Sequence, residues 1–404
     1  MRVLVAFDKF KDSLAAAEAC RIATDALRTA HPDWTFDSAP LTDGGDGFAS
    51  ILTAASGGKL HPTHVAGPLG EPRTAAFGLV RWDRVPPAAR DRLSLPSVRD
   101  SDTVAIVEMA AASGLALVPT DQRNPWRTTS YGTGQLLATA ATRGARAVLL
   151  GVGGSATHDL GLGALAALGL RFLDDHHALL FPPTTSAWEH ITQLVGHVPS
   201  SFPPLRLACD VANPLLGPHG AAATYAPQKG LRPAELPQLE SASIRLAAML
   251  SSHCGQTPAL AHLPGAGAAG GIAFGLMTAA RAQLVPGWAL VHEWLDLSNR
   301  IACADLVITG EGRFDSTSLS GKGPGALALA AAEAGKRVLI LAGSLGQLPA
   351  GALPPGVEVH AISPSDLPLT DAILRAPALL ATAVDRACAW STAWPTAPGS
   401  DPSG

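Results

Sequence analysis

The sequence is poor in charged residues, and lysine is especially scarce. Charged residues make up 15% of the 404 residues, against about 25% in an ordinary globular protein. The formal net charge is −4 and no dense Lys/Arg tract occurs, which argues against a nucleic-acid partner. Hydrophobic residues reach 47%, which excludes a disordered chain. The lysines are Lys9, Lys11, Lys59, Lys229, Lys322 and Lys336.

Cysteine pairs and long apolar runs are also missing. The five cysteines are widely scattered and form no CxxC or CxxH pair, so neither a disulfide framework nor a zinc site is indicated. The first apolar run, residues 3–7, is too short for a signal peptide. No uncharged apolar stretch reaches the ~18–20 residues of a membrane-spanning helix. We therefore expect a soluble, cytoplasmic chain without a membrane partner.

Short apolar runs alternate with helical patterns along the chain, which is typical of an α/β protein with a mostly parallel sheet. The predicted strands are residues 3–7, 104–107, 147–152, 205–208, 306–309, 338–342 and 357–362. The predicted helices are residues 13–29, 133–142, 160–168, 234–250, 325–334 and 372–390. Turn signals within residues 61–80 predict a hairpin, and the Pro-rich segments 82–102 and 181–204 predict exposed loops.

A Gly-rich loop, residues 151–163, connects a predicted strand to a predicted helix. Glycines let the backbone approach an anion closely, and the N–H groups at the start of a helix bind phosphate. The pattern lacks GxGxxG with a following acidic residue, so a dinucleotide fold is not favoured. The loop therefore predicts a phosphate site, with a tight structural turn as the alternative. Its candidate residues are Gly153, Gly154, Ser155, Ala156 and Thr157.

A second Gly-rich segment, residues 304–325, follows another predicted strand. Glu311 and Asp315 emerge at the carboxyl end of that strand, where ligands of open α/β sheets bind. Arg313 and Lys322 could neutralise phosphate charge, although the segment does not match a Walker P-loop. The alternative is a solvated loop with incidental charges.

Two further clusters carry carboxylates. Asp43 and Asp46 flank a pair of glycines just before a predicted helix, which suggests a site for Mg²⁺ or for a substrate hydroxyl. Asp210 ends an apolar strand, and Asn213 follows it. The alternatives are a helix N-cap and an Asx turn. Phosphoryl transfer needs charge neutralisation, a metal and a carboxylate to take the hydroxyl proton, so a kinase is plausible from these residues alone.

The chain resembles the bacterial type I glycerate kinases, the group related to glycerate 2-kinases. The resemblance is carried by eight segments that occur in the family's order and cover nearly the whole chain except the tail. They are residues 7–19, 41–48, 107–119, 123–137, 151–163, 209–230, 265–271 and 305–324.

The resemblance implies ATP-dependent phosphorylation of D-glycerate with Mg²⁺, at the 2-hydroxyl, to give 2-phosphoglycerate and ADP. It implies a Rossmann-like parallel-sheet domain built from both chain ends, residues 1–61 and 286–392. A mixed α/β domain, residues 62–285, would be inserted, with the active site in the cleft between the two. We expect the tail, residues 393–404, to be disordered.

The family's motifs place roles on particular residues of this sequence. Two positions depart from them: Asp12 stands where the family has Gly, and His158 where Asn is usual, a change that could bring a pH dependence. We expect catalytic roles for Asp210, Asp43 and Lys11. We expect nucleotide contacts from residues 153–157, Lys322 and Arg313, substrate contacts from Ser13, Asp46, Asn213 and Arg123, and metal contacts from Glu311 and Asp315.

Two alternative functions remain open from the sequence. The departures at Asp12 and His158 are compatible with a kinase for a related hydroxy acid, such as tartronate or a sugar acid. A non-catalytic metabolite-binding regulator could also use the same scaffold, although the many potential catalytic groups argue against it. The expected partners are small molecules, and the sequence leaves the oligomeric state open.

The distribution of lysine yields a prediction. Four of the six lysines lie within the family-matching segments, and only Lys59 and Lys336 lie outside them. Lysine and arginine are not interchangeable at a compact phosphate contact. We therefore expect Lys11→Arg and Lys322→Arg to reduce turnover far more than Lys59→Arg or Lys336→Arg in a steady-state kinase assay. Comparable losses at all four positions would show that the lysine pattern reflects composition only.

Overall fold

The structure, a computed structural model, describes the backbone of residues 1–391 and the side chains of residues 1–386. The chain forms two compact units, which we call the smaller and the larger unit. The smaller unit contains both chain ends, Met1–Leu41 and Ser298–Gly404, and the larger unit is Thr42–Leu297. The tail that we expect to be disordered, residues 393–404, lies outside the described residues.

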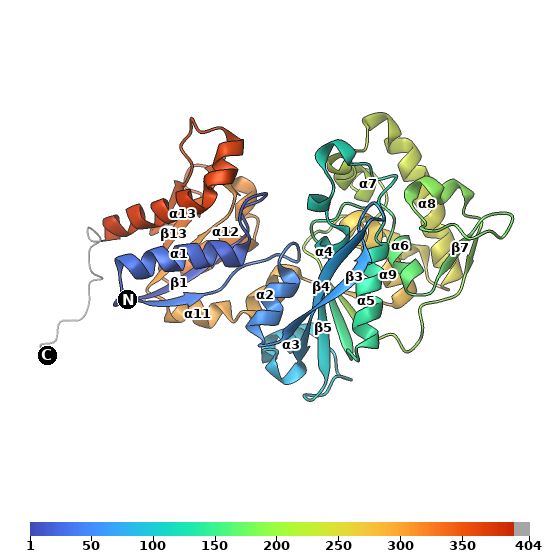
Figure 1. The fold of residues 1–404 in the computed structure, drawn as a ribbon, viewed down its shortest axis with the longest axis horizontal. Helices are drawn as coiled ribbons and strands as arrows, with labels where there is room; N and C mark the ends of the chain where they lie inside the picture. Colours follow the sequence, from blue (N-terminus) through green and yellow to red (C-terminus); the bar gives the residue numbers. More distant parts are fainter. Residues whose placement is uncertain (392–404) are drawn as a thin grey trace, which may run out of the picture. The chain divides into compact units, whose positions relative to one another are not determined.

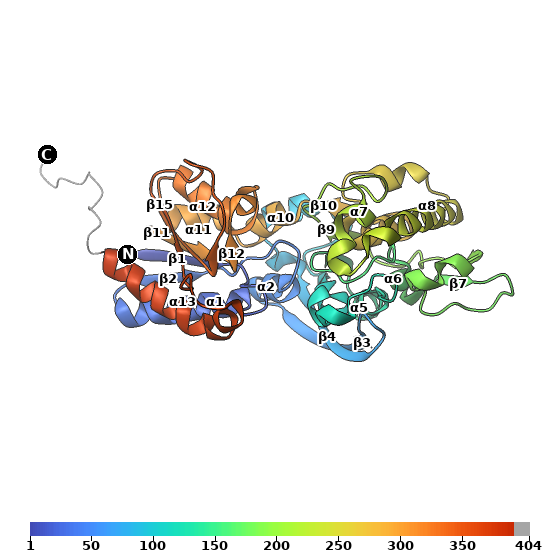
Figure 2. The ribbon, with the colours of Figure 1, turned by 90° about the horizontal axis from the view of Figure 1, so that it is seen from above.

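The smaller unit is built on a five-stranded parallel sheet. In spatial order its strands are β15 (Val357–Ala361), β13 (Arg337–Ala342), β11 (Leu306–Gly310), β1 (Arg2–Phe7) and β2 (Thr35–Ser38). Helices α1 (Ala16–Ala30) and α13 (Leu369–Ser391) pack together on one face, and α11 (Leu297–Cys303) and α12 (Gly323–Glu333) lie on the other (Figure 2). Because helices cover both faces, the central strands are buried hydrophobic runs.

The larger unit is built on a six-stranded mixed sheet (Figure 1). In spatial order its strands are β10 (Gln283–Val285), β9 (Leu205–Ala208), β6 (Ala147–Gly151), β5 (Thr103–Glu108), β4 (Pro72–Arg81) and β3 (Lys59–Ala66). The first four run parallel, while β4 pairs antiparallel with both β5 and β3. The hairpin predicted within residues 61–80 is therefore confirmed.

Helices α2 (Phe48–Ala55) and α5 (Tyr131–Thr142) cover opposite faces of this mixed sheet. Along β4, Phe77 lies in the core that also contains Leu136 of α5, whereas the next residue, Gly78, faces Thr53 of α2. This alternation follows from the two-residue period of a strand. Other helices of the unit are α3 (Pro87–Leu93), α4 (Ala110–Ser113), α6 (Leu162–Ala167), α7 (Ala221–Tyr225), α8 (Leu236–His253), α9 (Ala268–Ala280) and α10 (Gly287–Trp294).

Two pairs of short strands lie outside the two main sheets. Strands β7 (Arg171–Leu173) and β8 (Gln193–Val195) form an antiparallel pair in the larger unit. In the smaller unit, β12 (Arg313–Phe314) pairs parallel with β14 (Ser344–Leu345). Within the described residues, no helix has the length and the apolar character that crossing a membrane demands.

All seven predicted strands and all six predicted helices form, with ends shifted by up to three residues. The prediction of plain loops in the two Pro-rich segments is wrong. Helix α3 forms within residues 82–102, because a proline fits the first turn of a helix. A 3₁₀ helix, Thr185–His190, and strand β8 form within residues 181–204.

The boundaries between the two units differ from the expected domain boundaries. Contacts divide the chain after Leu41 and after Leu297, whereas the sequence analysis places the divisions after residues 61 and 285. The two intervening segments contain α2 and α10. Helix α2 packs on β4 and β5, and α10 contacts α3 and β9, so both helices belong to the core of the larger unit.

A close contact between α5 and α6 gives a test of the packing. A Cβ atom at Gly134 of α5 would lie 2.4 Å from the carbonyl oxygen of Ala164 in α6. Alanine favours an isolated helix over glycine by about 1 kcal/mol, but overpacking costs about 1–3 kcal/mol. We therefore expect Gly134→Ala to lower the free energy of unfolding in urea titrations.

The exposed residue Thr142, at the end of the same helix, supplies the control. We expect Thr142→Ala to change the free energy of unfolding by less than about 0.5 kcal/mol. A Gly134→Ala variant that is as stable as the wild type would contradict the close packing of the two helices.

Candidate active site

Three loops of the larger unit meet at the carboxyl ends of β5, β6 and β9. The Gly153 N–H donates to the Gly44 carbonyl oxygen at 2.9 Å, and the Val152 N–H donates to the Ala208 carbonyl oxygen at 3.4 Å. A Cβ atom at Gly153 would lie 2.7 Å from the Cα atom of Gly45. The glycines are therefore required for the backbones to approach this closely.

Two of the predicted catalytic residues, Asp43 and Asp210, lie close to each other at this meeting point. Asp210 follows β9, and its Oδ2 accepts a hydrogen bond of 2.8 Å from the Trp288 N–H at the start of α10. A Cβ atom at Gly287 would lie 3.0 Å from Asp210 Oδ2 and 3.2 Å from the Asp43 carbonyl oxygen. The two predicted catalytic aspartates of this unit are thus neighbours.

The carboxylate of Asp46 lies on the same side, beside the Gly-rich loop. A Cβ atom at Gly154 would lie 3.6 Å from Asp46 Oδ1. The loops therefore place Asp46 next to the predicted phosphate site. Parallel strands gather such residues because their carboxyl ends share one edge of the sheet.

Glu108, which the sequence analysis missed, also lies at this edge. It is the last residue of β5, and its carboxylate accepts the N–H groups of Gly47 at 3.2 Å and Ala49 at 2.9 Å. A carboxylate at the start of a helix, here α2, is stabilised by the unpaired N–H groups there. An acidic residue that closes a buried strand was the signal that could have found it.

Asp159, a completely buried residue of the Gly-rich loop, holds the loop in place. Its Oδ2 accepts the N–H of Ser130 at 2.7 Å, the Ser130 hydroxyl at 2.8 Å and the Gly163 N–H at 3.3 Å. Its Oδ1 accepts the Gly161 N–H at 3.1 Å. Burial raises the pKa of the Asp159 carboxyl, and these hydrogen bonds act in the opposite direction.

Helix α9 supports the same loop from another side. Ala269, Gly270 and Gly271 have φ values of 55°, 70° and 89°, which interrupt the helix. A Cβ atom at Gly270 would lie only 2.0 Å from the Thr157 carbonyl oxygen, and the Gly270 carbonyl accepts the Leu160 N–H at 3.1 Å. The left-handed backbone and the close approach explain why glycine is needed there.

Within the loop, the side chains differ in accessibility. Ala156 and Thr157 are buried, so their contribution to a ligand site would come from the backbone. Ser155 keeps 8% of its surface exposed, and its hydroxyl accepts a hydrogen bond of 2.8 Å from Lys229 Nζ. The Ser155 hydroxyl is thus a polar group of the loop that lies against Lys229.

In the smaller unit, predicted residues gather at the carboxyl ends of β1 and β11. A Cβ atom at Gly312 would lie 3.0 Å from the backbone nitrogen of Lys11. Lys322 directly precedes α12, and a Cβ atom at Gly323 would lie 3.9 Å from Asp8 Oδ2. The start of a helix that is preceded by a lysine suits a phosphate group. Asp8 is not among the predicted site residues, although Asp8 directly follows a buried strand.

Other predicted residues already have partners within their own units. Asp315 Oδ1 accepts from the Thr317 N–H and hydroxyl, and Oδ2 accepts from Arg313 Nε at 3.1 Å. These bonds, first those from Thr317, lower the pKa of the Asp315 carboxyl. The Ser13 hydroxyl donates to the Ile373 carbonyl oxygen at 2.9 Å. Its oxygen could still accept a hydrogen bond from a ligand.

Two predicted substrate residues of the larger unit are also engaged locally. Asn213 Nδ2 donates to the His219 carbonyl oxygen at 2.8 Å, and its Oδ1 accepts from the Tyr225 hydroxyl at 2.6 Å. Arg123 Nε lies 3.5 Å from the Val118 carbonyl oxygen. Asn213 therefore holds the loop after β9 together through bonds to more distant residues of that segment.

The predicted metal ligands do not form a prepared cage. No group of three or more His, Cys, Asp or Glu side chains suited to a metal ion occurs among the described residues. Both oxygens of Asp315 are bonded within their own loop. Glu311 and Asp315 therefore do not fit a metal site built from protein side chains alone.

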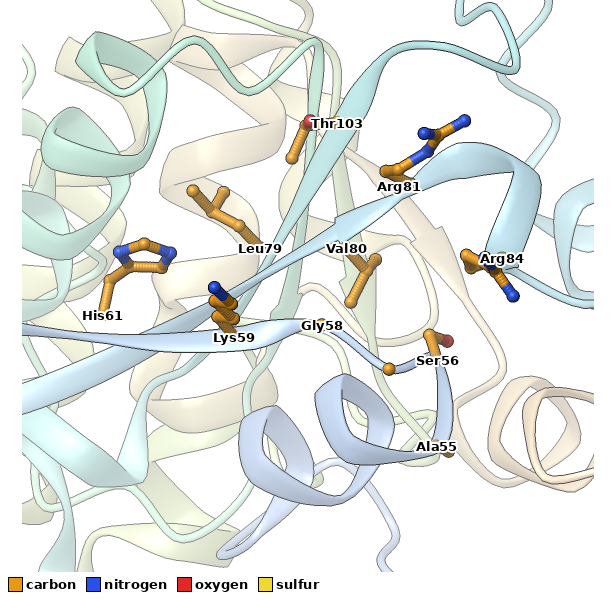
Figure 3. A pocket seen from close by; sticks show the side chains of 11 residues that line it. Ala55, Ser56, Gly58, Lys59, His61, Leu79, Val80, Arg81, Arg84 and Thr103 are labelled. Carbon is orange, nitrogen blue, oxygen red and sulfur yellow. The ribbon is translucent and has the colours of Figure 1, made fainter.

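A cavity of about 730 Å³ lies in the larger unit at the opposite end of β5 from Glu108 (Figure 3). It is bordered by the end of α2, the start of β3 and the end of β4. Its lining includes the basic residues Lys59, His61, Arg81 and Arg84. The cavity contains none of the predicted site residues, so the chemistry must be assigned from the loops rather than from this space.

A comparison with protein families identifies the family of the chain. The model described as the glycerate kinase family matches residues 3–392. The chain belongs to this family. Membership makes the protein a kinase, and a kinase family implies ATP as the co-substrate.

Individual relatives agree with this assignment. The glycerate kinase of Bacillus subtilis (strain 168) is 37% identical over 375 residues, which cover 92% of this chain and 93% of the relative. The glycerate 2-kinase of Escherichia coli (strain K12) is 36% identical over 347 residues, covering 85% and 86%. The crystal structure of a protein described as putative glycerate kinase 2, from Salmonella typhimurium LT2, superposes with a TM-score of 0.73 and 34% identity. It covers 97% of this chain and 98% of that one.

The glycerate kinase fold explains one of the two departures from the family motifs. Asp12 has a φ of 61°, in the left-handed region where glycine is most easily accommodated. Asp and Asn tolerate this region better than other side chains. The backbone conformation thus accounts for the family's glycine, and Asp12 is an exposed residue of the turn before α1.

The second departure, His158, lies in the protein interior. Its ring is fully buried, and its Nε2 lies 3.3 Å from the Ser243 hydroxyl of α8. Burial, together with the charge of Lys229, lowers the pKa of His158 to about 3. The ring of the folded protein is therefore neutral near pH 7.

This buried ring predicts how stability depends on pH. Between pH 6.5 and about 3 the unfolded chain binds a proton on His158 that the folded protein does not, so acidification favours unfolding. Going from pH 7.5 to pH 5.0 should cost the wild type about 2 kcal/mol from this residue. The His158→Asn variant lacks this contribution.

Urea titrations of both proteins at the two pH values measure the difference. We expect the wild type to lose about 2 kcal/mol more than His158→Asn on acidification. Because all other titrating groups are common to both proteins, equal losses would mean that the ring is already charged or accessible in the folded state.

Proposed function

We propose that the protein transfers the γ-phosphoryl group of ATP to the 2-hydroxyl of D-glycerate, forming 2-phosphoglycerate and ADP. Family membership supports the reaction class. The similarity to the E. coli glycerate 2-kinase supports the position of transfer. We further propose the cytoplasm, where ATP is available, as the place of the reaction.

One observation in the larger unit carries the assignment of roles. Asp43, Asp46 and Asp210 lie around the Gly-rich loop at a single edge of the sheet. Carboxylates beside a phosphate-binding loop are what a phosphoryl transfer to a hydroxyl requires, since one of them can accept the hydroxyl proton. We propose Asp210 or Asp43 as this general base, and Asp46 as a contact to the substrate hydroxyls.

In the smaller unit, we propose that Lys11 and Lys322 neutralise phosphate charge during transfer. Lys322 precedes α12, whose first N–H groups could bind phosphate oxygens. Arg313 remains a proposed nucleotide contact and would have to act while it is paired with Asp315. Arg123, Ser13 and Asn213 remain proposed substrate contacts.

We propose that Mg²⁺ is bound mainly by the nucleotide. Mg²⁺ usually keeps several waters and takes ligands from substrate phosphates, with only one or two carboxylates from the protein. This agrees with the lack of a carboxylate cage at Glu311 and Asp315. When bound, the ion would neutralise charge on the phosphate oxygens.

Removing the candidate base should abolish most of the activity. General bases contribute about 10²–10⁴-fold to rates, so we expect Asp210→Asn or Asp43→Asn to lower kcat by at least about 10²-fold. The exposed surface residue Asp33 supplies a control, and Asp33→Asn should retain the wild-type kcat. If both Asp210→Asn and Asp43→Asn kept near-normal turnover, neither residue would be the base.

The substrate is tested by measuring ADP formation over a panel of hydroxy acids. We expect D-glycerate to be the preferred acceptor, with ³¹P and ¹H NMR placing the phosphate on the 2-oxygen. ADP formation only with tartronate or sugar acids would assign a different acceptor. No ADP with any acid would leave a metabolite-binding regulator as the function.

A further inference from the structure

Lys229 is a buried cation without a carboxylate against it. Only 1% of its surface is exposed, although it lies in a single 3₁₀ turn, Pro227–Lys229. Its Nζ donates to the Ser155 hydroxyl at 2.8 Å and to the Thr157 carbonyl oxygen at 2.6 Å. Both acceptors are neutral, and the described residues include no ion pair of Lys229 with an acidic side chain.

The charged and titratable groups around Lys229 do not replace such a partner. Asp159, in the Gly-rich loop, raises the pKa of Lys229 by attraction, but its two oxygens accept from Ser130 and from backbone N–H groups. His158 is neutral near pH 7. The hydroxyl of Tyr225 in α7 donates to Asn213 Oδ1. The backbone carbonyl oxygen of Arg123 lies close to Gly230, the residue after Lys229.

A buried ammonium with only neutral acceptors is costly. Burial lowers the pKa of Lys229 to about 7. Near neutral pH the free protein therefore holds a mixture of charged and uncharged Lys229. Any negative charge that arrives close to the residue favours the charged form and raises this pKa.

The Ser155 hydroxyl connects Lys229 to the Gly-rich loop through a hydrogen bond. Because its oxygen accepts from Lys229, its own proton can point toward another acceptor. A donor polarised by an adjacent ammonium forms stronger hydrogen bonds. Ser155 keeps only 8% of its surface exposed, but its neighbour Gly154 is exposed and lies beside the Asp46 carboxylate.

We propose that Lys229 is a positioning residue that makes the Gly-rich loop, through the Ser155 hydroxyl, a site for an anionic oxygen of the substrate. This oxygen belongs either to the glycerate carboxylate or to a phosphate of ATP. The proposal rests on the proposed function and specifies which residues recognise the negative charge there. Binding of the anion takes up a proton on Lys229.

Calorimetric titration of the full-length protein with D-glycerate, and separately with ADP, tests the proposal. Measurements at pH 6.0 and pH 8.5, in buffers of different ionisation enthalpy, give both affinity and proton uptake. For the ligand that the loop recognises, we expect affinity at least about tenfold weaker at pH 8.5, because Lys229 is then mostly uncharged in the free protein. The glycerate carboxylate does not titrate in this range, so its pH dependence would be assigned to the protein.

Lys229→Met removes the charge and keeps a similar side-chain length. We expect this variant to lose the linked proton uptake and the pH dependence of affinity for the same ligand. Lys59→Met removes a lysine from the distant cavity and should leave both unchanged. A Lys229→Met protein with the wild-type affinity, pH profile and proton uptake would overturn the proposal.

Ser155→Ala tests the connection through the Ser155 hydroxyl independently if Lys229→Met fails to fold. It keeps the lysine but removes the hydroxyl, so we expect weaker binding of the same ligand with a reduced pH dependence. Wild-type protein that binds both ligands without proton uptake would overturn the proposal as well. Failure of the proposed function is distinguishable, since a protein that binds glycerate with proton uptake but forms no ADP contradicts only the kinase assignment.

Discussion

The Gly-rich loop of the larger unit depends on one buried carboxylate. Asp159 accepts hydrogen bonds from Ser130, at the start of α5, and from the N–H groups of Gly161 and Gly163 around the start of α6. A carboxylate is stable in the interior only when such donors satisfy it. The hydrogen bonds to Asp159 thereby hold the starts of both helices and the loop between β6 and α6 together.

The neighbouring loops use backbone contacts for the same purpose. Gly153 and Gly270 lie so close to other main-chain atoms that side chains would not fit. Polar side chains are thus concentrated at the few positions that face outward, such as Asp46 and Asp210. In an enzyme for phosphoryl transfer, where positioning and charge dominate the chemistry, a rigid backbone frame around a few charged groups is physically suitable.

Much of the fold could be predicted from the sequence because parallel strands covered on both faces are short apolar runs. Residues 205–208 show this most directly, since the predicted strand and β9 have the same ends. Helix α10 is absent from the predicted helices because it is only eight residues long, too short for a clear helical pattern. The equally short α2 is the helix expected directly after Asp46, although the sequence does not define its ends. The prolines of the segment that contains α3 predict a loop, although proline is compatible with the first turn of a helix.

The sequence by itself determined the family, the α/β class and the positions of the Gly-rich loops, because these depend on local residue order. Only the tertiary structure decided which polar residues are available. It placed Asp43 beside Asp210, engaged Asp315 with Arg313, and buried both His158 and Lys229. The physical reason is that hydrogen-bond partners and burial are set by segments far apart in the chain. No local pattern records whether a charged side chain faces water, a carboxylate or a neutral hydroxyl.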